Sequence, residues 1–433
     1  MNKWLFCLLL PLLFSCKEQV DETYLTPEKA IQYFSEIKEI CDRDNGKLWG
    51  KNLYGPLMLI DRQSRKITAN QPDKEGQLKY KDGIYTGLYP RERIISNSIV
   101  HFGGTPFATA ALPNAEDAFR IKTRAIHGLF HGLQEADGIQ PSSFNIKSMD
   151  EKESRFWLKL EWKALRKAIE TQGKERQSAI RDALIFRYTS NELFLRNTPE
   201  GKKFENQEGL GTFTYTLFST ESHEEFKKRI LENLNRVYSF RSYSRSYGYI
   251  HGALYSTLLY EKGFDFKTIT SDTIDLGMAV KELYHIELPE ICRDVAGSIS
   301  MNYDVDVIVK EEETRLAEIK ESLHKQTSKF TEKPVVLLEL ESPAFDFEPE
   351  DIHPLDSLGT LYNSIRVSDN WGKLNVEKSG CLMSSDLKFL RISARGLKSE
   401  KNHITGEGWT LILNNEIELT RVNDNYIISK HRP

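Results

Sequence analysis

Two histidines, His127 and His131, lie four residues apart in a stretch whose apolar residues recur at helical spacing. On a helix, this spacing places both imidazoles on one face, a single turn apart. Two imidazoles in that arrangement can bind one metal ion together. Spacing alone still favours a simpler interpretation, in which one histidine is satisfied in the core and the other is exposed.

The sequence around this pair matches a known pattern. Residues 127–134 read HGLFHGLQ, and residues 103–109 read GGTPFAT. Both segments resemble a family of bacterial proteins in the gluzincin clan, relatives of thermolysin and aminopeptidase N, whose helix carries HExxH, often as HELFHRxQ. In that clan, the strand that corresponds to residues 103–109 lies along the site and pairs with extended peptide. Further blocks match in the same order, at residues 53–57, 70–73, 160–165, 245–255, 364–372 and 405–411.

The resemblance also implies a third metal ligand. Residues 205–213 (ENQEGLGTF) are similar to the clan's NEGLAEY-type helix, whose first glutamate completes the zinc site. This match assigns Glu208 as the third zinc ligand, with Glu161 as the runner-up. The other role expected of Glu161 is to orient a histidine ligand by a hydrogen bond. The simpler interpretation of Glu208 is a solvated carboxylate near a helix start, where the helix dipole favours it.

Residues 245–255 supply candidates for stabilising the oxyanion of a tetrahedral intermediate. In the clan, a Tyr or His beyond the ligands often donates this hydrogen bond. The match points to Tyr249, His251 and Tyr255. An aromatic helix at this spacing is also typical of plain core.

The main departure from the pattern is Gly128, which stands where HExxH has its glutamate. That glutamate is the general base for the zinc-bound water, and glycine has no proton acceptor. Losing a general base costs roughly 10²–10⁴-fold in rate. We therefore expect a metallopeptidase-like protein with impaired catalysis that still binds zinc or a peptide.

Two alternatives stay open. One is an active zinc metallopeptidase that uses a different base, with Glu135, Glu161 and His251 as candidates. The other is a metal-free surface lipoprotein that recognises its ligand through its C-terminal β module.

The N-terminal residues predict export and lipid attachment. Lys3 and the apolar run of residues 4–14 are typical of a secretory signal, and the run is too short to span a bilayer. Residues 13–16 (LFSC) resemble a lipobox, which implies cleavage after residue 15 and a lipid on Cys16. The alternative is an ordinary signal peptide with an incidental cysteine. We expect a cell-envelope protein anchored by its lipid to the outer membrane, facing either the periplasm or the medium.

Composition excludes other classes of protein. The 433 residues include 59 Lys+Arg and 63 Asp+Glu, and the pI is near 6.3, so nucleic acid is not an expected partner. Beyond the signal and Cys16, the cysteines Cys41, Cys292 and Cys381 are widely spaced, which excludes a cysteine zinc site and predicts buried thiols.

The elements that must position these residues change in character along the chain. Thr26 followed by Pro27 predicts the start of a helix that reaches about residue 41. Strands are expected at 57–60, 66–69, 83–88, 98–102 and 106–112. Helices are expected at 115–135, 155–172, 177–191, 207–218, 224–243, 247–262, 275–284 and 315–329. From residue 334 onward, about six short strands predict a small β domain.

The expected fold class is therefore α+β. The predicted parts are a lipoprotein signal peptide at 1–15, a tether and N-terminal helix at 16–48, a zincin-like metallopeptidase-type domain at 49–330, and a small all-β domain at 331–433. In the zincin-like domain, an N-terminal β-sheet is followed by a mostly helical part.

Overall fold

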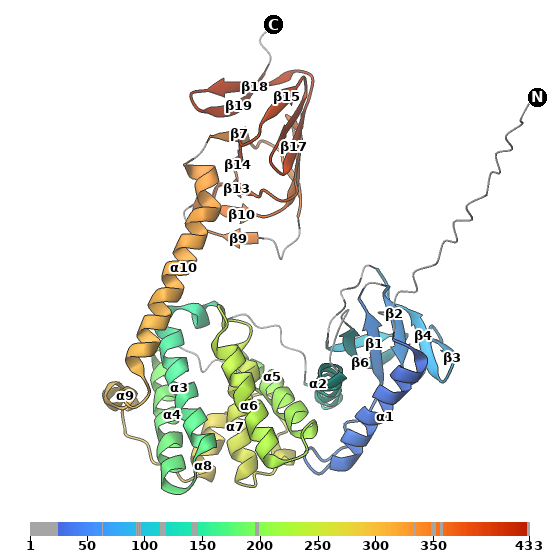
Figure 1. The fold of residues 1–433 in the computed structure, drawn as a ribbon, viewed down its shortest axis with the longest axis vertical. Helices are drawn as coiled ribbons and strands as arrows, with labels where there is room; N and C mark the ends of the chain where they lie inside the picture. The colour runs from blue at the N-terminus through green and yellow to red at the C-terminus, as the bar shows by residue number, and fades with distance from the viewer. Residues whose placement is uncertain are drawn as a thin grey trace, which may run out of the picture. The chain divides into compact units, whose positions relative to one another are not determined.

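The computed structural model describes residues 25–62, 64–91, 93, 95, 97–112, 118–139, 146–194, 199–332, 334–347, 352–355 and 358–430. Within these residues the chain is mixed α+β, with ten α-helices and three mostly antiparallel sheets (Figure 1). It divides into two compact units, residues 1–312 and 313–433. No helix in the described ranges has the length and apolarity to cross a membrane. The predicted signal peptide and Cys16 lie outside the described residues.

Helix α1 (Pro27–Asp44) opens the first unit and begins where the sequence predicts. The Thr26 side-chain oxygen accepts a hydrogen bond from the backbone N–H of Lys29 at 3.3 Å, which caps the helix. One face of α1 is buried and includes Ile37 and Cys41. Burial raises the pKa of the Cys41 thiol to about 12, so this thiol stays protonated at neutral pH.

A six-stranded sheet follows, in the order β3-β4-β2-β1-β6-β5. Its strands are β1 (Leu57–Asp61), β2 (Lys66–Ala69), β3 (Lys79–Lys81), β4 (Ile84–Leu88), β5 (Ile99–Phe102) and β6 (Thr105–Leu112). Neighbouring strands are antiparallel except β1 and β6, which are parallel. The five strands expected in this region are present, and β3 is additional.

The resemblance implies that residues 103–109 form a strand that lies along the site and pairs with peptide, but the structure places them differently. Gly103 and Gly104 have φ angles of 53° and 73° and turn the chain from β5 into β6. β6 then pairs with β1 on one side and with β5 on the other. The strand at this edge of the sheet is therefore β5, and β6 is an inner strand.

The rest of the first unit is helical. Its helices are α2 (Ala118–Ala136), α3 (Lys152–Glu170), α4 (Gly173–Phe194), α5 (Pro199–Phe218), α6 (His223–Tyr238), α7 (Tyr247–Glu261), α8 (Leu276–Leu283) and α9 (Cys292–Ser300), with 3-10 turns at Lys147–Asp150 and Phe266–Thr268. Helix α10 (Val305–Thr331) runs through the boundary between the two units. Helices α3 and α4 run side by side (Figure 1). Helix α9 is the one that the sequence pattern did not predict.

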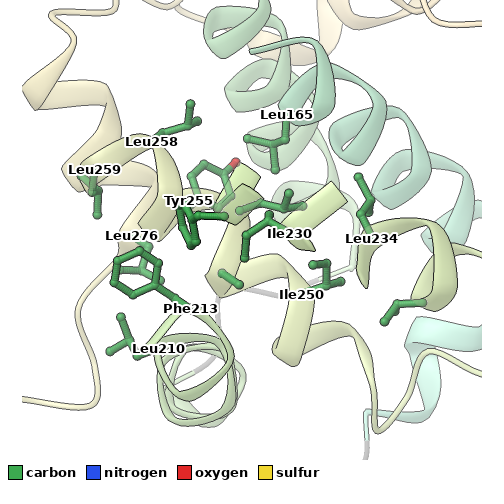
Figure 2. Packing of buried hydrophobic residues seen from close by; sticks show 14 of the residues in the cluster. Leu165, Leu210, Phe213, Ile230, Leu234, Ile250, Tyr255, Leu258, Leu259 and Leu276 are labelled. Atoms are coloured by element: carbon green, nitrogen blue, oxygen red, sulfur yellow. The ribbon is translucent and has the colours of Figure 1, made fainter. Parts of the chain in front are cut away.

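Helix α7 is the centre of the helical core. Twelve of its fifteen residues are buried, because it is apolar on nearly all sides. Figure 2 shows the side chains that surround it, among them Leu165 of α3, Phe213 of α5, Ile230 of α6 and Leu276 of α8. A helix that is enclosed in this way holds its polar side chains at fixed positions.

Helices α5 and α7 approach each other backbone to backbone through glycines. A Cβ atom added at Gly209 would lie 2.5 Å from the Gly252 Cα, and one added at Gly252 would lie 2.3 Å from the Glu205 carbonyl oxygen. Neither position tolerates a side chain without moving a helix. The register of α5 against α7 is fixed by these contacts, and with it the positions of Glu208 and Tyr249.

The second unit contains two sheets that share one core. Their orders are β18-β19-β7-β14-β13-β10-β9 and β15-β16-β17-β12-β11-β8. Buried residues from both sheets, such as Leu338 and Trp409, belong to the same apolar cluster. The strands are β7 (Val335–Glu339), β8 (Ala344–Asp346), β9 (Ile352–Pro354), β10 (Thr360–Tyr362), β11 (Ile365–Asp369), β12 (Gly372–Val376), β13 (Cys381–Met383), β14 (Phe389–Ser393), β15 (Lys398–Glu400), β16 (His403–Gly406), β17 (Trp409–Leu413), β18 (Ile417–Val422) and β19 (Asn425–Lys430). The β-rich C-terminal part is thus present, with more strands than the six expected.

The three remaining cysteines are free thiols. Cys41 and Cys381 are buried as expected, while Cys292 is only partly buried. Burial raises the pKa of Cys381 to about 12, as it does for Cys41.

Candidate metal centre

Two helices bring three potential metal ligands together. His127 and His131 project from α2, and Glu208 projects from α5. The Glu208 Oε2 atom lies 3.2 Å from the His127 Nε2 and 3.6 Å from the His131 Nε2. One ligand atom from each residue falls within 4.8 Å of the other two. No other group of three His, Cys, Asp or Glu side chains among the described residues converges in this way.

The nitrogen of His127 is close to the carboxylate without being hydrogen-bonded to it. His127 Nε2 is buried and has no hydrogen-bond partner, although Glu208 Oε2 is 3.2 Å away. A buried polar atom without a partner costs about 1–3 kcal/mol. A metal ion bound by all three side chains would give His127 Nε2 a partner. Two imidazole nitrogens and one carboxylate oxygen form a donor set that fits Zn²⁺ and leaves a coordination position open.

Gln134 fixes the orientation of His131. Its side-chain oxygen lies 2.8 Å from the His131 Nδ1, one helical turn further along α2. An amide oxygen accepts from an N–H, so Nδ1 donates to Gln134, and Nε2 is the ring nitrogen on the side of Glu208. This is the partner that a metal-binding histidine ordinarily has on its second nitrogen.

Burial and mutual contact shift the pKa values of all three side chains. Burial, together with the neighbouring His131, lowers the pKa of His127. Burial also acts to lower the pKa of His131, but the Glu208 carboxylate and Gln134 outweigh it and the net shift is upward. Burial acts to raise the pKa of Glu208, yet the two histidines hold it well below its usual range. Glu208 is therefore ionised at neutral pH, as a metal ligand must be.

Two tyrosines line this centre. The ring of Tyr215 stacks on His127, with centroids 5.7 Å apart and an angle of 25° between the rings. The ring of Tyr249 meets His127 edge-on at 6.0 Å. Burial and the Glu208 carboxylate raise the pKa of Tyr249, so its hydroxyl stays protonated and can donate a hydrogen bond. Of the three residues predicted to stabilise an oxyanion, Tyr249 is the one at this centre.

The other two, His251 and Tyr255, lie in a different buried cluster. There the Tyr255 hydroxyl donates to Glu161 Oε1 at 2.6 Å, and His251 Nε2 lies 3.2 Å from the same oxygen. Arg187 joins the cluster through His251 and Glu205. Glu161, the runner-up ligand, thus contacts a histidine, but that histidine is His251 rather than a member of the candidate centre. Glu161 therefore does not belong to the group of converging ligands, which is His127, His131 and Glu208.

Gly128 packs against the sheet. A Cβ atom at this position would lie 3.2 Å from the Cβ of Ala108 on β6, which is tighter than ordinary contact. Glu135, one of the alternative bases, is hydrogen-bonded to His101 of β5, with 2.7 Å between Glu135 Oε1 and His101 Nε2. The helix that carries both histidines is therefore held against β5 and β6.

Sequence reasoning did not single out Tyr215 or the side chains that extend the centre into a cavity. Tyr215 follows Glu208 by seven residues, which is two helical turns on one face, so the spacing could have found it. The cavity has a volume of about 460 Å³ and is lined by His127, Tyr215 and Tyr249 together with residues of α2, α5 and α6. Its α6 residues come from a separate segment of the sequence, and nothing in their spacing links them to α2.

Comparison of the chain with known protein families, with curated proteins and with solved structures found no match.

Proposed function

We propose that this chain is a lipid-anchored cell-envelope protein with a gluzincin-like centre, which binds zinc and peptide but is impaired as a peptidase. The observation that carries the proposal is the convergence of His127, His131 and Glu208 around a buried His127 nitrogen that lacks a partner. Bound there, zinc would act as a Lewis acid toward a water molecule or a peptide carbonyl. The lipid on Cys16 and the outer-membrane location follow from the lipobox resemblance alone.

The impairment follows from Gly128, because the helix offers no carboxylate at the position of the usual base. The alternative bases are held elsewhere. Glu135 is engaged with His101, while Glu161 and His251 are engaged with each other in a separate buried cluster. An active peptidase with a different base therefore has less support than an impaired one.

Peptide binding is supported by the strand at the sheet edge. β5 lies beside α2, since Ile99 approaches the position of Gly132 and His101 meets Glu135. A strand at an edge can pair with an extended peptide through backbone hydrogen bonds. A peptide bound in this way would run next to the helix that carries both histidines, and the Tyr249 hydroxyl could donate to one of its carbonyls.

Metal content tests the proposal. The protein is purified in detergent, and its zinc is measured by mass spectrometry next to His127→Ala, Glu208→Ala and the matched control His324→Ala. His324 is an exposed histidine on α10. We expect about one zinc per chain in the wild type and the control, with loss in the two site variants. No zinc in the wild type after loading would overturn the proposal in favour of a metal-free binding lipoprotein.

A peptide-cleavage assay distinguishes an impaired peptidase from an active one. Zinc-loaded protein is incubated with a diverse peptide library, and cleavage is followed by mass spectrometry. We expect no turnover above background. Chelator-sensitive cleavage that disappears in His127→Ala would instead establish an active peptidase with a different base.

A further inference from the structure

The cavity beside the candidate metal centre is rich in arginine. Arg124 of α2 and Arg229 and Arg236 of α6 line it, and Glu232 is the carboxylate among the described lining residues. Arg229 lies 3.3 Å from Glu232, which balances one positive charge within the cavity wall. The lining as a whole still carries more positive than negative charge.

Arg236 is bound to a neutral partner. Its guanidinium donates to the side-chain oxygen of Asn233 at 3.3 Å, and no carboxylate in the described residues forms an ion pair with it. Asn233 in turn donates to the Tyr215 hydroxyl at 3.4 Å. The Tyr215 ring stacks on His127. A continuous set of contacts therefore links the Arg236 cation to the imidazole of the first candidate ligand.

We propose that this cavity is an anion subsite that receives a carboxylate of the peptide bound at the metal centre. The inference rests on the proposed function, because it treats His127 as part of the peptide-binding site. Guanidinium groups match carboxylates in shape and charge and bind them by paired, charge-assisted hydrogen bonds. A volume of about 460 Å³ accommodates a side chain or a chain end.

The geometry also sets where on the peptide the carboxylate lies. His127, Tyr215 and Tyr249 line both the centre and the cavity. The carboxylate therefore belongs to a residue close to the peptide group that faces the metal centre. An acidic side chain and a free C-terminus both carry this group, and the test distinguishes them.

The test measures binding of fluorescent peptides to the full protein by anisotropy. Three peptides of equal length share one sequence: one has an internal Glu and an amidated C-terminus, one has Gln and a free C-terminus, and one has Gln and an amidated C-terminus. We expect one or both carboxylate peptides to bind about 10- to 100-fold more tightly than the neutral peptide. The preference should fall as salt is added.

Variants locate the source of the preference. Arg236→Gln should bring the affinity for the acidic peptide down to the affinity that the same variant shows for the neutral peptide. Arg366→Gln, an exposed arginine paired with Asp346 in the second unit, should keep the preference. Arg124→Gln provides a second test if Arg236→Gln does not fold, and it should reduce the preference as well.

Zinc content is measured on the same samples, so the two proposals fail separately. Equal affinity for the three peptides, or a preference that survives both arginine variants, overturns the anion subsite and leaves the metal centre standing. Absence of zinc overturns the proposed function whatever the peptides do. Zinc without any peptide binding overturns the subsite and the peptide-binding part of the function together.

Discussion

Gly211 lies directly against the imidazole of His127. A Cβ atom built at Gly211 would stand 2.8 Å from the His127 Nε2 and 2.9 Å from its Cδ2. The ring therefore occupies the space that any other residue type at position 211 would need. The last helical turn before Tyr215 is thus shaped to admit the candidate ligand.

The first prediction concerns this contact. Gly211→Ala should displace the His127 ring and abolish stoichiometric zinc, because the methyl group would stand 2.8 Å from Nε2, closer than the two atoms can approach without one of them moving. The matched control is Gly297→Ala on α9, where an added Cβ meets nothing within 4 Å. Zinc per chain and circular dichroism are measured for both variants. Full zinc occupancy in a folded Gly211→Ala would contradict the placement of His127.

The second prediction concerns the orientation of His131. Gln134→Leu keeps the size of the side chain but removes the oxygen that accepts from Nδ1. Loss of such a partner costs about 10–100-fold in metal affinity. Competition with a chelator gives the affinity, and Gln32→Leu at an exposed position of α1 serves as the control. An unchanged zinc affinity would mean that Gln134 does not hold the ring.

The third prediction places a carboxylate where the resemblance to HExxH expects the base. Gly128→Glu places a carboxylate beside the first histidine, and the helix must give by a few tenths of an ångström against Ala108. Gly128→Ala carries the same steric cost without the carboxylate. We expect chelator-sensitive peptide cleavage in Gly128→Glu alone, about 10²–10⁴-fold above Gly128→Ala. If both variants fold, bind zinc and remain equally inactive, Gly128 is not what impairs catalysis.

The sequence predicts most of the elements and all three converging residues. The spacing of His127 and His131 dictates a shared helix face, and the resemblance supplied Glu208 from a helix 77 residues further on. The predicted bounds of the strands in the first sheet lie close to the observed ones, because its apolar residues come in short runs between turn residues.

Other features depend on tertiary contacts that spacing does not encode. Helix α7 is apolar on nearly all sides, so no periodicity tells which neighbour its polar residues face. For this reason Tyr249 and His251, two residues apart, could not be assigned to different clusters. The Gly209–Gly252 contact and the place of Arg236 in the cavity wall likewise depend on the packing of helices that are distant in sequence.

The buried cluster around Glu161 predicts how stability depends on pH. Burial acts to raise the pKa of Glu161, but His251, Arg187 and Tyr255 outweigh this effect. The pKa of Glu161 therefore lies below its usual value of 4.5. A carboxyl whose pKa is lower in the folded than in the unfolded state stabilises the fold above the unfolded pKa. That contribution is lost as the pH falls through the folded pKa. Acidic conditions should therefore weaken this cluster.

The fourth prediction follows from this lowered pKa of Glu161 in the folded protein. Glu161→Gln removes one of the three carboxylates near buried Arg187 while Glu205 and Asp275 remain, which should destabilise the protein by about 1–3 kcal/mol at pH 7. As the pH falls from the usual value of 4.5 through the lower folded pKa, the wild type loses the same charge by protonation, so the gap in Tm between wild type and variant should narrow. Glu321→Gln, an exposed glutamate on α10, should show no gap at either pH. A gap that stays constant from pH 7 into acid would show that Glu161 acts through packing rather than through its charge.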